Sequence, residues 1–201
     1  MKRKIFFLIM LFTGFYLFAQ EGEPKGLLQD EDKSESKFKI GLYIPVGLPV
    51  GSIGEYENFS LGLGFAAEYQ LPFKLNRIST GLAARMACKY VFLKEKAPMI
   101  FLGDANISAG AFVQFPFAAG KLNLIFQPEI EYGAVFHCLL PEKNSGLENL
   151  YVNQILCIVP SLRFSFVQNM ELEFSPFYMM EFQKTNLQHE AGLRLGILFY
   201  L

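Results

Sequence analysis

The stretch FSLGLGFAAEYQL, residues 59–71, decides the fold. Its odd-numbered positions are apolar and mostly large, whereas its even-numbered positions are small or polar. In a β-strand successive side chains point to opposite faces, so an alternation of period two indicates a strand with one apolar face. No helical spacing separates the two sets of residues in this way.

The same alternation recurs along the chain and predicts an all-β protein. Each run has one apolar face without a charged residue, and an opposite face that carries small residues and charges. An even number of such strands, joined by turns, fits an antiparallel up-and-down arrangement. Eight strands are predicted, over residues 38–48, 59–71, 78–93, 104–117, 122–138, 152–166, 171–182 and 190–201.

Alternation does not tell which face points outward. A soluble barrel or sandwich buries its apolar face, whereas an outer-membrane barrel turns that face to lipid and keeps a polar interior. The interior of an eight-stranded barrel is only just wide enough for side chains. The Phe, Leu and Ile side chains of the apolar faces would overfill that space; the chain contains 22 Phe. Volume therefore favours apolar residues outside and small or charged residues inside, with a soluble carrier as the alternative.

The connections support the membrane interpretation, because they alternate in length. Outer-membrane barrels have short periplasmic turns and longer external loops. Aromatic residues also gather near the predicted strand ends, as in the interfacial rings of such barrels. The long connections are 49–58, 94–103, 139–151 and 183–189, and the short ones are 72–77, 118–121 and 167–170.

The first 36 residues differ from the rest of the chain. Residues 1–20 combine a basic start with an apolar run that ends in Ala19, as in a secretory signal peptide; an uncleaved membrane anchor is the alternative. Residues 21–36 are acidic and without periodicity, and are interpreted as a flexible linker. Residues 37–201 form the predicted barrel. The net charge of −1 provides no basic field for nucleic acid.

The C-terminus resembles the assembly signal of bacterial outer-membrane barrels, which has the form polar-x-Gly-x-x-apolar-x-apolar. The matching residues are Arg194, Gly196, Phe199 and Leu201, although such signals usually end in Phe or Trp. With the eight strands, residues 37–201 resemble the small barrels of the OmpA, OmpX and OmpW type. The resemblance implies an integral protein in the outer membrane of a bacterium with two membranes, surrounded by lipid and inserted by the barrel-assembly machinery.

Charged residues on the small, polar face would share the barrel interior. Because an isolated buried ion costs several kcal/mol, these charges must pair or be hydrated. We expect a salt-bridged plug; a gated or ion-selective lumen and a proton relay through Glu129 and Glu131 are alternatives. The expected network consists of Lys39, Glu68, Arg85, Lys89, Glu129, Glu131, Arg163, Glu171, Glu173 and Arg194.

Small barrels that resemble the lipid A acyltransferases and deacylases use His with Ser, Asp or Glu near the external rim, and this resemblance makes the two histidines the candidates for catalysis. His137 is predicted at the outer end of the fifth strand, and His189 in the last external loop. Asp104 and Ser145 are possible partners if the loops converge. The sequence carries no motif for a metal, a cofactor or a phosphate, so we expect no catalytic residue, metal or cofactor.

Cysteines and prolines complete the set of expectations. Three cysteines cannot all pair, and we expect them to be free: Cys88 and Cys138 on the lipid face and Cys157 on the lumen face. A closed barrel has no edge where a missing N–H is harmless, so prolines inside strands predict local gaps in the ladder. The prolines concerned are Pro128, Pro160 and Pro176.

The expected function is that of a non-enzymatic outer-membrane barrel with a structural or surface-interaction role through its external loops. The extracellular ligand is unknown, and nucleic acid is excluded as a partner. One alternative is a narrow pore or transporter for small or hydrophobic molecules. A lipid-modifying enzyme is the other.

Overall fold

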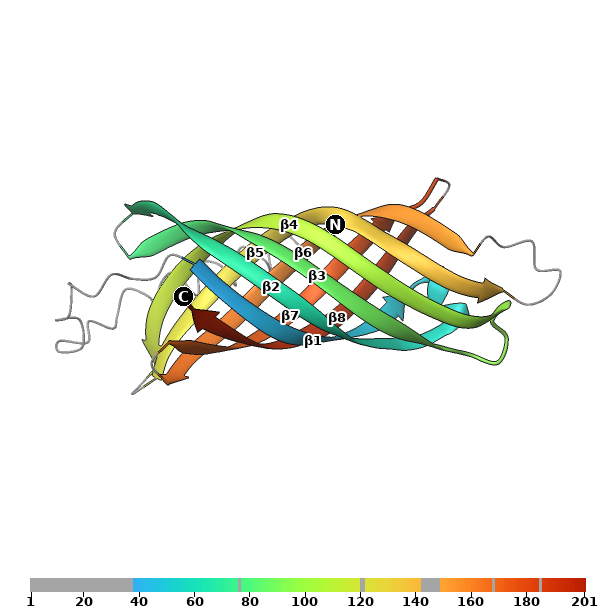
Figure 1. Ribbon diagram of the computed structural model, residues 1–201, viewed down its shortest axis with the longest axis horizontal. Helices are drawn as coiled ribbons and strands as arrows, with labels where there is room; N and C mark the ends of the chain where they lie inside the picture. Colours follow the sequence, from blue (N-terminus) through green and yellow to red (C-terminus); the bar gives the residue numbers. More distant parts are fainter. Residues whose placement is uncertain (1–37, 76, 120–121, 142–148, 168, 185) are drawn as a thin grey trace, which may run out of the picture.

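The protein is a closed barrel of eight antiparallel strands (Figure 1). The computed structural model describes residues 38–75, 77–119, 122–141, 149–167, 169–184 and 186–201, so the predicted signal peptide and linker lie outside the described residues. No helix in the described ranges is long and apolar enough to cross a membrane. A short 3-10 helix, η1 (Ser52–Glu55), follows the first strand. The strands are β1 (Phe38–Val50), β2 (Glu57–Leu75), β3 (Ile78–Leu93), β4 (Met99–Ala119), β5 (Leu122–Pro141), β6 (Leu150–Val167), β7 (Met170–Phe182) and β8 (Leu187–Tyr200).

The prediction of eight strands is confirmed, and most strands are longer than predicted. The largest extension is in β4, which runs over Met99–Ala119 instead of 104–117. The prediction that His189 lies in an external loop is wrong. His189 belongs to β8, because it pairs with Val50 of β1 on one side and Met180 of β7 on the other. Because its first residues pair with neighbouring strands, β8 begins at Leu187, before the alternation of apolar residues from which the strand was predicted.

The strands are inclined to the barrel axis. Starting at Ile40 and following paired residues from strand to strand around the barrel, the path returns to β1 at Val50, ten residues further along. A stagger of this kind requires a strand tilt of roughly 35–45°. The tilt lets side chains from strands that are not neighbours meet inside the barrel.

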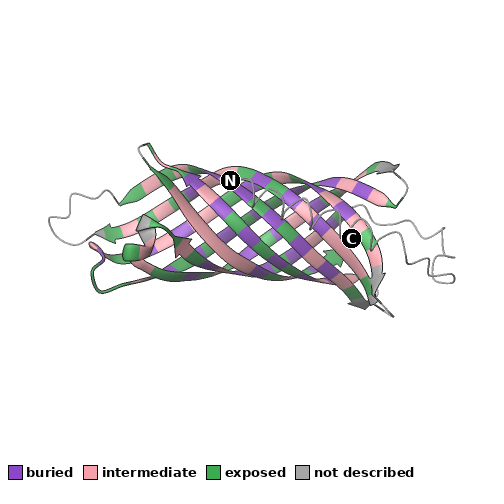
Figure 2. Cartoon of the chain, turned by 180° about the vertical axis from the view of Figure 1, so that it is seen from behind, coloured by how far each residue is buried: buried purple, intermediate pink, exposed green. Residues whose placement is uncertain are grey.

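The apolar face points outward, as predicted. Leu63 is 61% exposed and Ile197 is 39% exposed, whereas the Arg163 side chain inside the barrel is fully buried. Figure 2 shows buried and exposed residues in alternation along the strands. The arrangement suits a hydrocarbon surrounding, because closure pairs the strands all round while the outer surface stays apolar.

The inward face is not made of small residues and charges alone. Tyr43, Phe112 and Phe177 are also buried in the lumen. Glycines on neighbouring strands make room for these rings: a Cβ on Gly64 would lie 2.2 Å from the ring of Tyr43, and one on Gly81 would lie 2.1 Å from the ring of Phe112. Part of the glycine content of the inward face therefore accommodates aromatic rings.

Aromatic side chains cluster near both ends of the barrel. At the external end, the rings of Phe59 and Phe92 stack with centroids 4.2 Å apart, and Tyr90 contacts Phe92 edge-on. At the opposite end, Phe115 and Phe126 have centroids 6.3 Å apart. These positions match the two interfacial aromatic rings of an outer-membrane barrel.

The outward orientation predicts the effect of a charge at Leu63. Leu63→Arg places a cation on the outer face between the aromatic clusters, and should cost about 2–4 kcal/mol of folding free energy in lipid vesicles. The matched variant Leu187→Arg lies at the external end of β8 and should cost roughly 0–1 kcal/mol. Urea titrations followed on unboiled gels measure both; equal stabilities would mean that Leu63 does not face hydrocarbon.

Candidate functional site

A group of buried ions fills the middle of the lumen, and we call it the central cluster. It contains three guanidinium groups and four carboxylates. They come from six strands, and each lies on the inward face of its strand. All seven residues belong to the network expected from the sequence. The members are Glu68, Arg85, Glu129, Glu131, Arg163, Glu173 and Arg194.

Arg163 binds the carboxylate of Glu68 through both terminal nitrogens. Its Nη1 donates to Oε2 at 2.6 Å and its Nη2 donates to Oε1 at 2.6 Å. Nη2 also lies 3.2 Å from Oε2 of Glu173. Paired charged hydrogen bonds in this geometry are among the strongest that side chains make. The Arg163–Glu68 contact ties β6 to β2 across the lumen.

Arg85 connects the carboxylates of several strands. Its Nη2 lies 2.9 Å from Glu68 and 2.9 Å from Glu129, and its Nε lies 3.3 Å from Glu131. Arg194 in turn binds Glu131 through both terminal nitrogens. The cluster is thus one continuous network, in which each carboxylate faces at least one guanidinium group.

Neutral polar residues extend the network, and sequence reasoning did not single them out. Gln127 is fully buried and donates to Glu129 at 3.4 Å, while Gln114 donates to Gln127 at 2.7 Å. Ser108 donates to Glu131 at 2.8 Å. Their inward parity on β4 and β5 was the available signal, because it places them on the same face as the charges.

A further ion pair lies toward the chain ends of the barrel and joins the central cluster through Arg163, whose Nη1 lies 3.9 Å from Oε2 of Glu171. Lys39 donates to both oxygens of Glu171, at 3.0 and 2.9 Å. The hydroxyl of Tyr200 donates to the same carboxylate, and the Lys39 Nζ lies 4.4 Å from the centroid of the Tyr200 ring. This pair joins β1, β7 and β8 and accounts for two further residues of the expected network.

An apolar group on β5, β6 and β7 lies between the central cluster and the external mouth on that side of the lumen. Along β7 the inward residues are Glu173 and Ser175, then Phe177 and Met179, and then Glu181 at the outer end. Phe177 and Met179 pack with inward side chains of β5 and β6 in one buried group. The rest of that group is Val135, Ile155, Cys157 and Val159.

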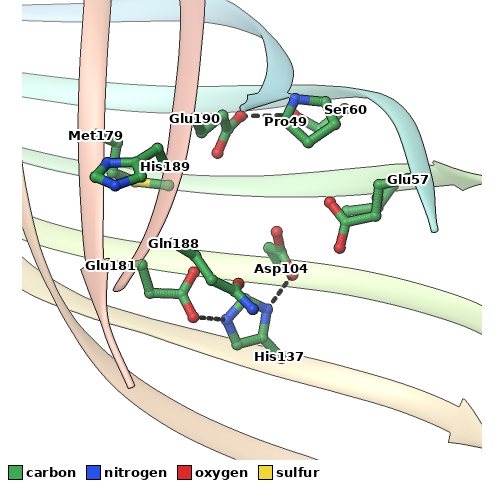
Figure 3. A pocket seen from close by; sticks show the side chains of 11 residues that line it. Pro49, Glu57, Ser60, Asp104, His137, Met179, Glu181, Gln188, His189 and Glu190 are labelled. Carbon is green, nitrogen blue, oxygen red and sulfur yellow. Dashed lines mark hydrogen bonds and ion pairs between the residues drawn. The ribbon is translucent and has the colours of Figure 1, made fainter. Parts of the chain in front are cut away.

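At the external mouth His137 is held between two carboxylates (Figure 3). Its Nδ1 lies 2.7 Å from Oδ1 of Asp104, and its Nε2 lies 3.0 Å from Oε1 of Glu181. Because both ring nitrogens face acceptors, the imidazolium form, which donates from both, satisfies this geometry. The structure thus brings together His137 and Asp104, which the sequence named as possible partners; Ser145 lies outside the described residues.

Lys89 completes the mouth, and it is the last residue of the expected network. Its Nζ donates to Glu190 at 2.6 Å and lies 3.9 Å from Asp104. Ser60 donates to the other oxygen of Glu190 at 2.8 Å. The cavity between these groups encloses about 30 Å³, which is room for a water-sized group.

The described residues of the mouth do not have the arrangement of a nucleophilic centre. A catalytic histidine activates a hydroxyl or thiol within hydrogen-bond reach, with the second ring nitrogen oriented by a carboxylate. Here carboxylates occupy both nitrogens of His137. His189 contacts the hydroxyl of Tyr178 at 2.9 Å, at an exposed position. The described residues contain no group of three potential ligands placed to hold a metal ion.

The cysteines and the C-terminal motif are divided between the two faces. Cys88 and Cys138 are exposed and Cys157 is buried, and all three are free thiols, as the sequence predicts. Of the assembly-signal residues, Arg194 points inward, whereas Phe199 and Leu201 are exposed on the outside. A Cβ on Gly196 would lie 3.2 Å from Cβ of Tyr43. The role of this motif in assembly stays a prediction.

The bidentate contact predicts a large effect of Arg163→Met. Removing this guanidinium leaves Glu68 and Glu173 buried with fewer partners, and should cost about 3–5 kcal/mol of folding free energy. Lys184→Met, at an exposed position after β7, is the matched loss of a cation and should change stability by less than about 0.5 kcal/mol. Urea titration in lipid vesicles measures both; equal effects would contradict a central role for the network.

Comparisons with known proteins show the fold. No family model matches the chain, and no curated protein matches its sequence. Among solved structures, Neisserial surface protein A is 12% identical with a TM-score of 0.53, over 83% of this chain and 98% of that one. The outer membrane enzyme PagL is 11% identical with a TM-score of 0.49, over 81% and 99%. Ail of Yersinia pestis is 16% identical with a TM-score of 0.46, over 81% and 95%. The chain has the fold of the small eight-stranded outer-membrane barrels.

Proposed function

We propose that this protein is a non-enzymatic, integral outer-membrane barrel with a closed lumen, and that it acts through its external surface. The observation that carries the proposal is the continuous ion-pair network across the lumen, surrounded by an apolar outer face. The apolar face supports placement in a bilayer. The network supports a structural interior instead of a conducting one.

Two barriers in series oppose passage through the lumen. An ion would have to displace the bidentate Arg163–Glu68 contact, in which both side chains are at most 1% exposed. It would also have to pass the apolar group around Phe177 and Met179, whose side chains do not replace its hydration. This arrangement favours a plug over the narrow pore or transporter that the sequence left open.

The external end provides an ordered surface for contacts outside the membrane. The backbone N–H of Lys94 donates to the carbonyl of Tyr56 at 2.8 Å, which joins the connection before β2 to the one after β3. The Tyr56 side chain is 42% exposed there. An exposed aromatic residue on a connection that is fixed to its neighbour suits a surface-interaction role.

The closed lumen predicts the absence of conductance. Purified full-length mature barrel in planar bilayers should give no steady unitary current, because the ion pairs stay intact in the folded state. The conductance of the Arg163→Met variant in the same lipid indicates whether loss of one cation opens a path for ions. Steady unitary currents from the wild-type protein would support the transporter alternative.

The occupied histidine predicts that lipid A stays unmodified. Mass spectra of lipid A should be the same from cells that express the wild-type barrel, the His137→Ala variant or no barrel, because both ring nitrogens of His137 already bind carboxylates. His189→Ala is the matched control at the same end of the barrel. A lipid A species that requires the wild-type protein and disappears with His137→Ala would establish an enzyme.

A further inference from the structure

The ladder between β6 and β7 is interrupted halfway along the strands. Paired residues stop at Ile158 with Tyr178 and resume at Leu162 with Phe174, without a change of register. Residues 159–161 and 175–177 lie between these pairs and are not paired with each other, although they pair with β5 and β8 on their other sides. The unchanged register places Pro160 directly opposite Pro176, and we call this stretch the seam.

Two opposed prolines explain the length of the interruption. Proline has no N–H, so neither residue can donate the ladder hydrogen bond that antiparallel partners exchange. A single proline causes a shorter gap elsewhere: around Pro128, the β4–β5 pairing stops at Glu129 and resumes at Phe126. By contrast, the β3–β4 ladder is continuous from Ser79 to Tyr90.

The seam lies in the part of the wall that faces hydrocarbon. Pro160 and Pro176 are exposed on the outer face. Their neighbours on that face, Ile158 and Phe174, are 46% and 44% exposed. Water is absent from a bilayer core, so backbone groups without a ladder partner there are costly. Local support from inside the barrel is therefore required.

Three polar side chains on the lumen side provide that support, and we call them the clasp: Ser161, Ser175 and Glu173. The hydroxyl of Ser175 lies 2.7 Å from that of Ser161 and 2.5 Å from Oε1 of Glu173. The Ser161 hydroxyl lies 3.4 Å from the same carboxylate oxygen. The two serines are fully buried and belong to facing strands, so side chains join β6 to β7 beside the missing backbone hydrogen bonds.

We propose that the barrel wall opens locally at the seam between β6 and β7, and that the clasp holds the seam closed. Opening separates few backbone hydrogen bonds, because two are already missing. Closing depends on the contact between Ser161 and Ser175 and on the ion pair of Glu173 with Arg163 next to them. Local opening at the seam is a motion of the barrel wall, whereas the closed lumen is the resting state of the barrel.

Amide hydrogen exchange of the full mature chain in lipid nanodiscs tests the seam. The flanking amides of Ile158, Leu162, Phe174 and Tyr178 should exchange faster than those of Ala83 and Gly110, which are paired in the continuous β3–β4 ladder. Restoring the donors with the double variant Pro160→Val/Pro176→Val should slow the flanking amides by about tenfold or more.

A matched proline replacement controls for the general effect of removing proline. Pro116 pairs with Ile125 of β5, and on its other side it lies beyond the start of β3, where the ladder begins at Ser79 with Gln114. Pro116→Val therefore restores no bond across a seam and should leave the flanking amides unchanged. Equal effects of the double variant and this control would overturn the proposal, as would equal wild-type rates in the two ladders.

The clasp is tested separately with Ser175→Ala, which removes one hydroxyl and keeps both prolines. It should speed exchange of the flanking amides by about tenfold while amides of the β3–β4 ladder keep their rates. An equal acceleration around the whole barrel would indicate general destabilisation and would contradict the clasp. This variant and the wild-type comparison decide the question even if the double proline variant does not fold.

Discussion

Closure of the backbone ladder is the constraint on which the rest of this structure depends. In hydrocarbon each unpaired N–H or C=O costs several kcal/mol, so a sheet can be stable there only when its first and last strands meet. The pairing of β1 with β8 over twelve residue pairs meets this condition. Closure then fixes a narrow interior, and the narrow interior determines which side chains can lie there.

The residues of the interior meet two requirements. Charges withdrawn from water must be paired, and the space must be filled without voids. The central cluster pairs three arginines with four glutamates, while Tyr43 and Phe112 fill the space beside glycines. The apolar group of Phe177 and Met179 then fills the β5–β7 side of the lumen between this cluster and the mouth. These contacts connect the strands inside the barrel at several heights, including beside the seam between β6 and β7.

The sequence predicts the strands, their faces and the inward charges, because one period-two signal reports all three. It does not predict which charges meet. Arg163 contacts Glu68 across a separation of 95 positions, and this contact depends on the tilt and stagger of the closed barrel. The sequence analysis did not single out the aromatic residues in the lumen. The alternation tells which face a side chain is on, but it does not tell which glycine on the next strand makes room for a ring. The alignment of Pro160 with Pro176 required the register of β6 against β7, which no local pattern encodes.

The central claim is that the outer face of the strands meets acyl chains. Cys88 is exposed on that face and offers a direct test. In the variant Cys138→Ala/Cys157→Ala, a spin label on Cys88 in lipid vesicles can be measured for collisions with oxygen and with a water-soluble nickel chelate. The account predicts frequent collisions with oxygen and few with the chelate. The opposite ratio would mean that this face meets water and would contradict the membrane barrel.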